Sequence, residues 1–182
     1  APIAAKAGLR VVDNSSFFRM FEDVPLVVPE VNAGVIKESD RIIANPNCST
    51  IQCMPALAAI DKAYGLKRVV FSSYQAVSGS GMKGLAALDG QDNGCYAHPI
   101  QNNVLPHIDS FLDTGYTKEE MKMIEESQKI LGHRFGVTAT TARIPVRYAH
   151  SVSANVEVDK PFDLGELAQR LAEAAGVVLM DD

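Results

Sequence analysis

RIIANPNCST, residues 41–50, joins a short apolar run to a polar turn that ends in a cysteine. Residues 41–44, three of which are apolar, predict a buried strand, and the asparagine–proline–asparagine sequence after them ends it. Apolar residues at near-helical spacing then predict a helix over residues 49–63, with Gly65 as its C-terminal cap. A buried strand therefore leads Cys48 into the first turn of a helix, as in α/β folds.

The position of Cys48 favours a reactive thiol. At the start of a helix it would meet the positive end of the helix dipole and free backbone N–H groups. Both favour the thiolate, which is the nucleophilic form, and the same N–H groups could stabilise an oxyanion on an attacked carbonyl. The alternative is a small buried cysteine beside a turn. Cys53 falls inside the predicted helix and is expected in the core, and Cys95 lies in an irregular region.

The remainder of the chain alternates between strands and helices. Two runs precede the cysteine: residues 9–13 predict a buried strand, and residues 25–32 predict extended chain because proline discourages helix in the residue before it. After the cysteine we expect strands at 68–77, 135–146 and 151–159, and irregular chain at 89–106. We also expect a short helix at 82–88, a helix that begins at the capping box of Thr117 and Glu120 and ends at Leu131, and a last helix from Asp163. This order is α/β at the start and α+β thereafter.

Composition excludes several classes of protein. The 182 residues are 47% hydrophobic and 21% charged, with a formal net charge of −5. The scattered basic residues argue against nucleic-acid binding, the lack of a long apolar run against a membrane span, and the first residues against a secretory signal. Three irregularly spaced cysteines match neither a disulfide framework nor a metal site. We expect a cytoplasmic protein without a metal.

A cysteine nucleophile needs a base, and the chain has four histidines. His150 differs from the others because it lies between two β-rich runs and follows Arg143 and Arg147. Arginines at such a corner could bind a carboxylate or a phosphate through paired hydrogen bonds. Taken alone, such a cluster is more often a solvated loop.

Several groups of residues, in this order along the chain, resemble the motif set of aspartate-semialdehyde dehydrogenase. They are Asp13–Arg19, Val28–Asn32, Asn47–Thr50, Tyr74–Gly79, Glu119–Lys122, and Arg143 with His150 seven residues later. The resemblance covers essentially the whole chain. It implies the tail of a Rossmann-type cofactor domain over residues 1–46, followed by a glyceraldehyde-phosphate-dehydrogenase-like catalytic and dimerisation domain over residues 47–182, incomplete at its C-terminus.

The same resemblance implies a role for each matching residue. Cys48 would be the nucleophile, His150 its acid/base partner, and Gln75 would position the reacting carbonyl. The other implied residues are Arg143, Glu119 and Asn47 for the substrate, Arg19 and Lys122 for phosphate, and Ser78 and Gly79 near the nicotinamide. These roles are physically consistent, because an amino-acid substrate needs a cation for its carboxylate and an anion for its ammonium group.

The implied activity is the NADP-dependent reductive dephosphorylation of L-aspartyl 4-phosphate to L-aspartate 4-semialdehyde, in the biosynthesis of aspartate-family amino acids. The reverse reaction oxidises the aldehyde and consumes phosphate, and a homodimer or tetramer is implied. The family's Gly-rich dinucleotide loop does not occur in this sequence, so we expect a chain truncated at both ends. Two alternatives remain: N-acetyl-γ-glutamyl-phosphate reductase, and a non-catalytic dimerisation module.

Overall fold

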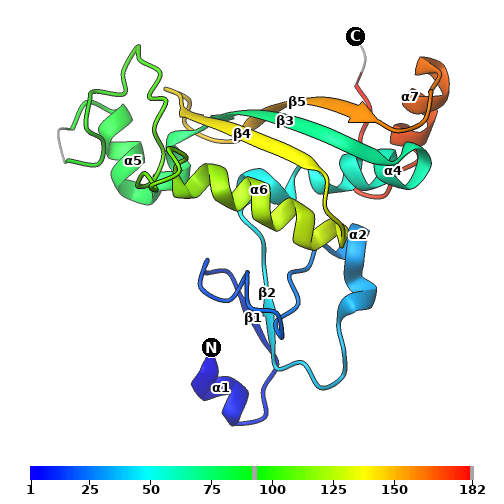
Figure 1. Ribbon diagram of the computed structural model, residues 1–182. Helices are drawn as coiled ribbons and strands as arrows, with labels where there is room; N and C mark the ends of the chain where they lie inside the picture. The colour runs from blue at the N-terminus through cyan, green and yellow to red at the C-terminus, as the bar shows by residue number, and fades with distance from the viewer. Residues whose placement is uncertain (92–93, 181–182) are drawn as a thin grey trace.

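The N-terminal part of the chain is a small parallel ribbon. The computed structural model describes residues 1–91 and 94–180. After the short helix α1 (Pro2–Lys6), strand β1 (Val11–Asp13) pairs in parallel with β2 (Ile42–Ala44). This ribbon projects away from the remainder of the molecule (Figure 1). The strands predicted around residues 9–13 and 41–44 are therefore confirmed, but their predicted burial is wrong: β1 has no buried residue, and Ala44 is the one buried residue of β2.

The second sheet has three strands in the order β4–β3–β5. The central strand β3 (Leu66–Gln75) runs parallel to β4 (Gly136–Arg143) and antiparallel to β5 (Ser151–Val158). A mixed sheet after a parallel ribbon confirms the predicted fold class. The register places Gln75 opposite Arg143 at the carboxyl ends of the two parallel strands. Two residues with expected site roles thus meet at one edge.

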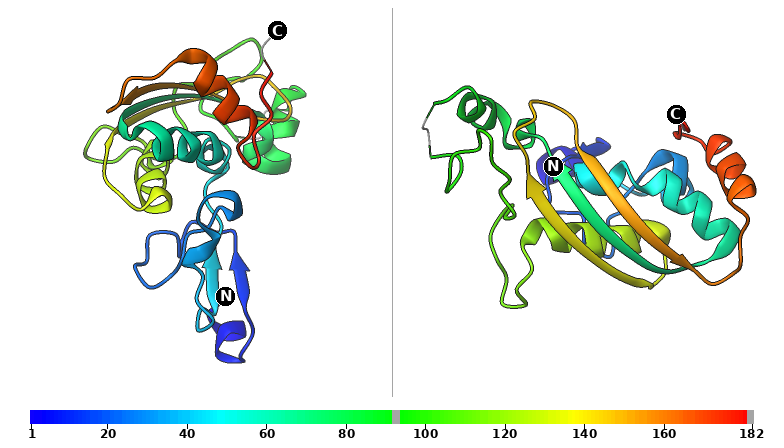
Figure 2. Two further views of the ribbon diagram at one scale, coloured as in Figure 1. Left: turned by 90° about the vertical axis from the view of Figure 1, so that its right-hand side faces the viewer. Right: turned by 90° about the horizontal axis from the view of Figure 1, so that it is seen from above.

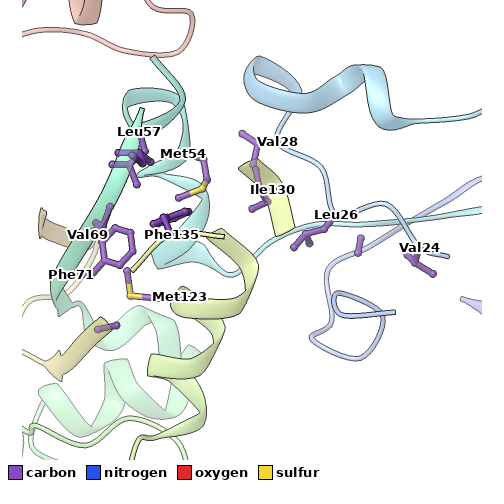
Figure 3. Close-up of a cluster of buried hydrophobic side chains, with 13 residues drawn as sticks. Val24, Leu26, Val28, Met54, Leu57, Val69, Phe71, Met123, Ile130 and Phe135 are labelled. Atoms are coloured by element: carbon purple, nitrogen blue, oxygen red, sulfur yellow. The ribbon is translucent and has the colours of Figure 1, made fainter. Parts of the chain in front are cut away.

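Helices cover one face of this sheet. Helices α4 (Met54–Tyr64) and α6 (Lys118–Leu131) pack beneath it, and α7 (Leu164–Ala172) packs against α4 (Figures 1 and 2). The core fills the space between sheet and helices; Figure 3 shows Met54, Leu57, Val69, Phe71, Met123 and Phe135 gathered there. The opposite face of the sheet carries no helix in the described part of the chain. Helix α5 (Gly81–Leu88) follows the short turn η2 (Val77–Ser80) at the end of β3.

Helix α6 begins and ends as its sequence predicts. The Thr117 hydroxyl accepts the Glu120 N–H at 3.3 Å, and the Glu120 carboxylate accepts the Thr117 N–H at 2.8 Å. This reciprocal pair satisfies two backbone donors that a helix start leaves free. Gly132 ends the helix in the left-handed conformation at φ 78°. The position of the first turn of α6 is therefore fixed locally, and that turn carries Glu119.

The helix predicted over residues 49–63 is wrong as a single element. The chain forms one turn, α3 (Cys48–Ile51), and then the separate helix α4. The cause is Pro55, whose ring nitrogen has no hydrogen to donate to the carbonyl of Ile51 and whose ring clashes with that group. Cys53 lies at this break, half-buried against the core. Gly65 caps α4 as predicted, with φ 74°.

The extended chain predicted over residues 25–32 is wrong in its second half. Leu26 forms a bridge with Ala44, but residues 29–32 form the helical turn α2 (Pro29–Asn32), followed by η1 (Ala33–Val35). Proline is well suited to the first position of a helix, where no donor is needed. The Asn32 side chain accepts the Val28 N–H at 2.8 Å and so stabilises the turn.

Helices of the described residues are all too short or too polar to cross a membrane. The same residues contain no group of three or more histidine, cysteine or acidic side chains placed to hold a metal ion.

Candidate active site

Cys48 is the first residue of α3 and is exposed. The preceding residue, Asn47, is the N-cap: its side-chain oxygen accepts the backbone N–H groups of Ser49 at 2.9 Å and Thr50 at 3.4 Å. The expectation that these N–H groups are free for an oxyanion is therefore wrong, because the cap occupies them. The dipole behind Cys48 is also that of a single turn.

Glu119 joins three of the predicted site residues. Its Oε1 accepts hydrogen bonds from Asn47 Nδ2 at 3.0 Å and from Gln75 Nε2 at 3.1 Å. Its Oε2 pairs with Lys122 Nζ at 3.1 Å, which confirms that Glu119 and Lys122 share one face of α6. Lys122 also pairs with Asp109 at 3.0 Å. A buried carboxylate thus ties the end of β3 to the turn that carries Cys48.

Glu126 is a buried residue that the sequence interpretation missed. Its Oε1 pairs with Arg19 Nη1 at 3.0 Å, and its Oε2 accepts the backbone N–H of Asn47 at 2.6 Å. Burial raises the pKa of Glu126, whereas the Asn47 N–H and the Arg19 guanidinium act in the opposite direction. The sequence did contain a signal for Glu126, because it lies seven positions after Glu119 and therefore on the same face of the helix.

His150 and Arg143 form a second group at the carboxyl end of the sheet. The N–H of Ala76 donates to His150 Nδ1 at 3.0 Å, and Arg143 Nη1 donates to the Ala76 carbonyl at 2.8 Å. The first bond makes Nδ1 an acceptor, so in the neutral ring the proton sits on Nε2. Ala149 adopts a left-handed φ of 68°, which is unusual for alanine and turns the chain just before His150.

Ser78 and Gly79 lie in η2, next to this group. The Ser78 N–H donates to the Arg147 carbonyl at 3.2 Å. A side chain at Gly79 would meet Arg143 Nη1 at 2.7 Å and His150 Nε2 at 3.4 Å. Glycine therefore keeps the approach to both groups open. Most of the predicted residues thus belong either to the network around Glu119 or to the group around His150. Arg19 lies apart from both, and Glu126 connects it to Asn47.

The histidine titrations test this geometry. Burial, and to a lesser degree the positive charge of Arg143, lowers the pKa of His150 from its ordinary value of 6.5. The hydrogen bond to Asp61 at 2.6 Å raises the pKa of His133. We expect an NMR titration to place the His150 midpoint below 6.5 and the His133 midpoint above it. His150 would then be a neutral imidazole at pH 7, with its proton on Nε2. A His150 midpoint above that of His133 would contradict the structure.

Two sequence-family models of the semialdehyde dehydrogenases together match most of the chain. The model described as "Semialdehyde dehydrogenase, dimerisation domain" matches residues 57–182, and the one described as "Semialdehyde dehydrogenase, NAD binding domain" matches residues 1–39. The first of these includes the three-stranded sheet and helix α6. The segment with Cys48 lies between the two matches.

Several individual relatives of the chain are named aspartate-semialdehyde dehydrogenases. The aspartate-semialdehyde dehydrogenase of Aquifex aeolicus is 47% identical over 100% of this chain and 58% of its own length. A crystal structure of the Vibrio cholerae enzyme II, complexed with ASA, is 45% identical with a TM-score of 0.92, covering 96% of this chain and 56% of that one. The Candida albicans enzyme with NADP is 26% identical with a TM-score of 0.71, covering 93% and 50%. The chain belongs to the semialdehyde dehydrogenase family, and the relatives that it resembles are aspartate-semialdehyde dehydrogenases. It spans little more than half the length of these relatives.

Proposed function

We propose that the chain carries the catalytic residues of an NADP-dependent enzyme that interconverts L-aspartyl 4-phosphate and L-aspartate 4-semialdehyde through a thioester on Cys48. The observation that carries the proposal is the contact of Glu119 with both Asn47 and Gln75. This contact connects the turn that carries the exposed Cys48 to the edge of the sheet where Arg143 lies. A nucleophile, a neutral imidazole and groups of both charges thus lie on adjoining segments.

Covalent chemistry begins at Cys48. In the oxidative direction the thiolate attacks the aldehyde carbon, and His150 acts as the acid partner: its Nε2–H donates a hydrogen bond to the carbonyl oxygen, which carries the negative charge of the thiohemiacetal. That oxygen forms a carbonyl again when the carbon loses hydride and the thioester forms, so the proton stays on Nε2. A lowered pKa suits this role, because the imidazole remains neutral at pH 7 with its proton on Nε2. Gln75 is buried at the end of β3 and positions the reacting carbonyl.

Charge complementarity supports an amino-acid substrate. Arg143 is buried apart from 6% of its surface and would bind the α-carboxylate, since a guanidinium offers paired donors. Glu119 would bind the ammonium group. Asn47, whose side-chain amide meets Glu119 at 3.0 Å, would support the thioester oxygen.

Phosphate would bind at Arg19 and Lys122. Phosphate attacks the thioester carbon, the bond to Cys48 Sγ breaks, and the sulfur leaves as the thiolate with aspartyl phosphate as the product. Arg19 supports this role, because its buried Nε has no hydrogen-bond partner among the described residues. Lys122 contacts Glu119 and Asp109, so its positive charge is held beside the substrate site.

Ser78 and Gly79 would lie beside the nicotinamide. The absence of a side chain at Gly79, next to Arg143 and His150, fits the close approach of a flat ring. A bound nicotinamide would accept the hydride that the thiohemiacetal carbon loses. The match of residues 1–39 to an NAD-binding domain and the NADP in the Candida albicans relative support this cofactor.

We also propose the domain division and the assembly. Residues 1–46 would end the cofactor domain, and residues 47–182 would form the catalytic and dimerisation domain. The face of the sheet without helices supports a homodimer or a pair of dimers. Tyr74 is 45% exposed and alternates along β3 with the buried Ser73 and Gln75, so it points to the opposite face from them. The exposed Cys48 and the half-buried Cys53 are free thiols, which is consistent with a reducing cytoplasm.

A comparison of two aldehydes tests the substrate. We expect kcat/KM for L-aspartate 4-semialdehyde to exceed that for N-acetyl-L-glutamate 5-semialdehyde by at least about 100-fold, because an acetylated nitrogen leaves the Glu119 carboxylate unpaired. Steady-state oxidation of both, with phosphate and NADP, measures this ratio. A preference for the acetylated aldehyde would identify the reductase of N-acetyl-γ-glutamyl phosphate instead. Failure of both aldehydes would support a non-catalytic dimerisation module.

A further inference from the structure

We propose that Glu126 is a positioning residue that sets the spacing between the phosphate-binding Arg19 and the turn that carries Cys48. The proposal rests on the proposed function, since it assumes that phosphate binds beside Cys48. It adds a residue to which no role in the reaction has been assigned above.

The two oxygens of Glu126 contact two separate parts of the site. Oε1 binds the Arg19 guanidinium at 3.0 Å, and Oε2 binds the Asn47 N–H at 2.6 Å. Only 1% of the Glu126 surface is exposed, so water competes little for either bond. A single rigid carboxylate therefore fixes how far the guanidinium lies from the residue before Cys48.

Neighbouring residues on α6 reinforce both contacts. Residues 119, 122, 126 and 129 recur at intervals of three and four, which places them on one helix face. Lys129 donates to the carbonyl oxygens of Arg19 at 2.7 Å, Phe21 at 2.7 Å and Val24 at 3.0 Å. Glu119 binds the Asn47 side chain. Arg19 and Asn47 are thus each held twice by the same helix.

A purely structural role explains this arrangement less well. Burying an ion pair costs solvation free energy that its mutual attraction often does not recover, and apolar side chains of similar size are often as stable. Burial also raises the pKa of Glu126, as expected for a carboxylate held in a dry site. The carboxylate provides what an apolar residue cannot, namely one acceptor for each of two donors at a fixed spacing.

Alkylation of Cys48 at increasing concentrations of inorganic phosphate tests the proposal without a cofactor. Phosphate bound beside Cys48 disfavours the thiolate and so slows labelling by iodoacetamide, which mass spectrometry of the modified peptide measures. We expect the half-effective phosphate concentration to rise at least about 10-fold in Glu126→Gln, corresponding to roughly 1.4 kcal/mol of binding. The labelling rate without phosphate should change much less.

Two further variants make the result specific. Glu125→Gln removes an adjacent, exposed carboxylate and should leave the half-effective concentration within about twofold, as expected for a surface change. Glu126→Asp keeps the charge but shortens the side chain, so it should also weaken phosphate binding, by at least about threefold given the loss of one charge-assisted bond. This variant decides the question if Glu126→Gln does not fold.

The outcomes are distinguishable. Equal phosphate dependence in Glu126→Asp and the wild type would overturn the positioning role and leave a requirement for charge alone. Equal dependence in Glu126→Gln and Glu125→Gln would overturn any role in phosphate binding. If phosphate did not affect Cys48 in the wild-type chain, the phosphate step of the proposed function would itself fail, and this inference with it.

Discussion

Replacement of Cys48 by alanine is expected to abolish turnover while leaving the stability of the fold unchanged. The sulfur of Cys48 would be the only protein atom that forms a covalent bond to the substrate. Its loss should therefore reduce kcat by at least about 10⁴-fold. The side chain is exposed and the turn is capped by Asn47, so the free energy of unfolding should change by less than about 0.5 kcal/mol. Steady-state rates of the active enzyme and a denaturant titration measure the two effects.

Cys53 provides the matched control for this substitution. It lies five residues away, half-buried against the core, and burial raises the pKa of its thiol to about 12. Such a thiol is protonated at neutral pH and unreactive. Cys53→Ala should therefore retain turnover and cost about 1 kcal/mol of stability through lost packing. If Cys48→Ala retained a rate near that of the wild type, the thioester mechanism would be excluded.

Substitution of Glu119 by glutamine is expected to reduce kcat/KM for L-aspartate 4-semialdehyde by about 100- to 1,000-fold, equivalent to roughly 3–4 kcal/mol from the loss of charge-assisted hydrogen bonds. The variant loses the anion proposed for the substrate ammonium group. It also places a new amide N–H near Asn47 and Gln75 or near Lys122, all of which donate to the carboxylate in the wild type. Substrate binding and the position of Asn47 should both be impaired.

Glu125→Gln again serves as the control for Glu119→Gln. It makes the same chemical change on the same helix at an exposed position, and kcat/KM should remain within about twofold. Steady-state kinetics over a range of aldehyde concentrations separate the effects on KM and kcat. A Glu119→Gln variant with less than about a fivefold loss would show that Glu119 does not bind the substrate and only supports its neighbours.

Local sequence determined the ends of several elements. The capping box of Thr117 and Glu120 and the left-handed Gly132 define α6, because their hydrogen bonds and backbone angles involve only nearby residues. Pro55 is an equally local signal, but the prediction of one helix over residues 49–63 gave more weight to apolar spacing than to the missing N–H group. Pro29 was misread in a similar way, since proline ends a helix but also begins one well.

Sequence motifs also indicated the candidate site, although not its contacts. Asn47, Gln75 and Glu119 belong to three separate motifs, and their order along the chain was enough to associate them. Their joint hydrogen bonding depends on how α6 packs beneath β3, with sequence separations of 72 and 44 residues. No pattern of spacing within one element contains that information.

The sequence by itself determined the order of the strands and of the longer helices, the caps of α6, and the candidate nucleophile with its base. The Asn47 side chain occupies the N–H groups that were expected to face an oxyanion, and this cap is a local contact with residues two and three positions later. Tertiary structure alone decided the contacts of His150 and Glu126. The Ala76 N–H selects the nitrogen of His150 that carries the proton. Glu126 is buried between Arg19 and Asn47, 107 and 79 residues away. The physical reason is that the partners of His150 and Glu126 are distant in the chain, and packing alone brings them within hydrogen-bonding distance.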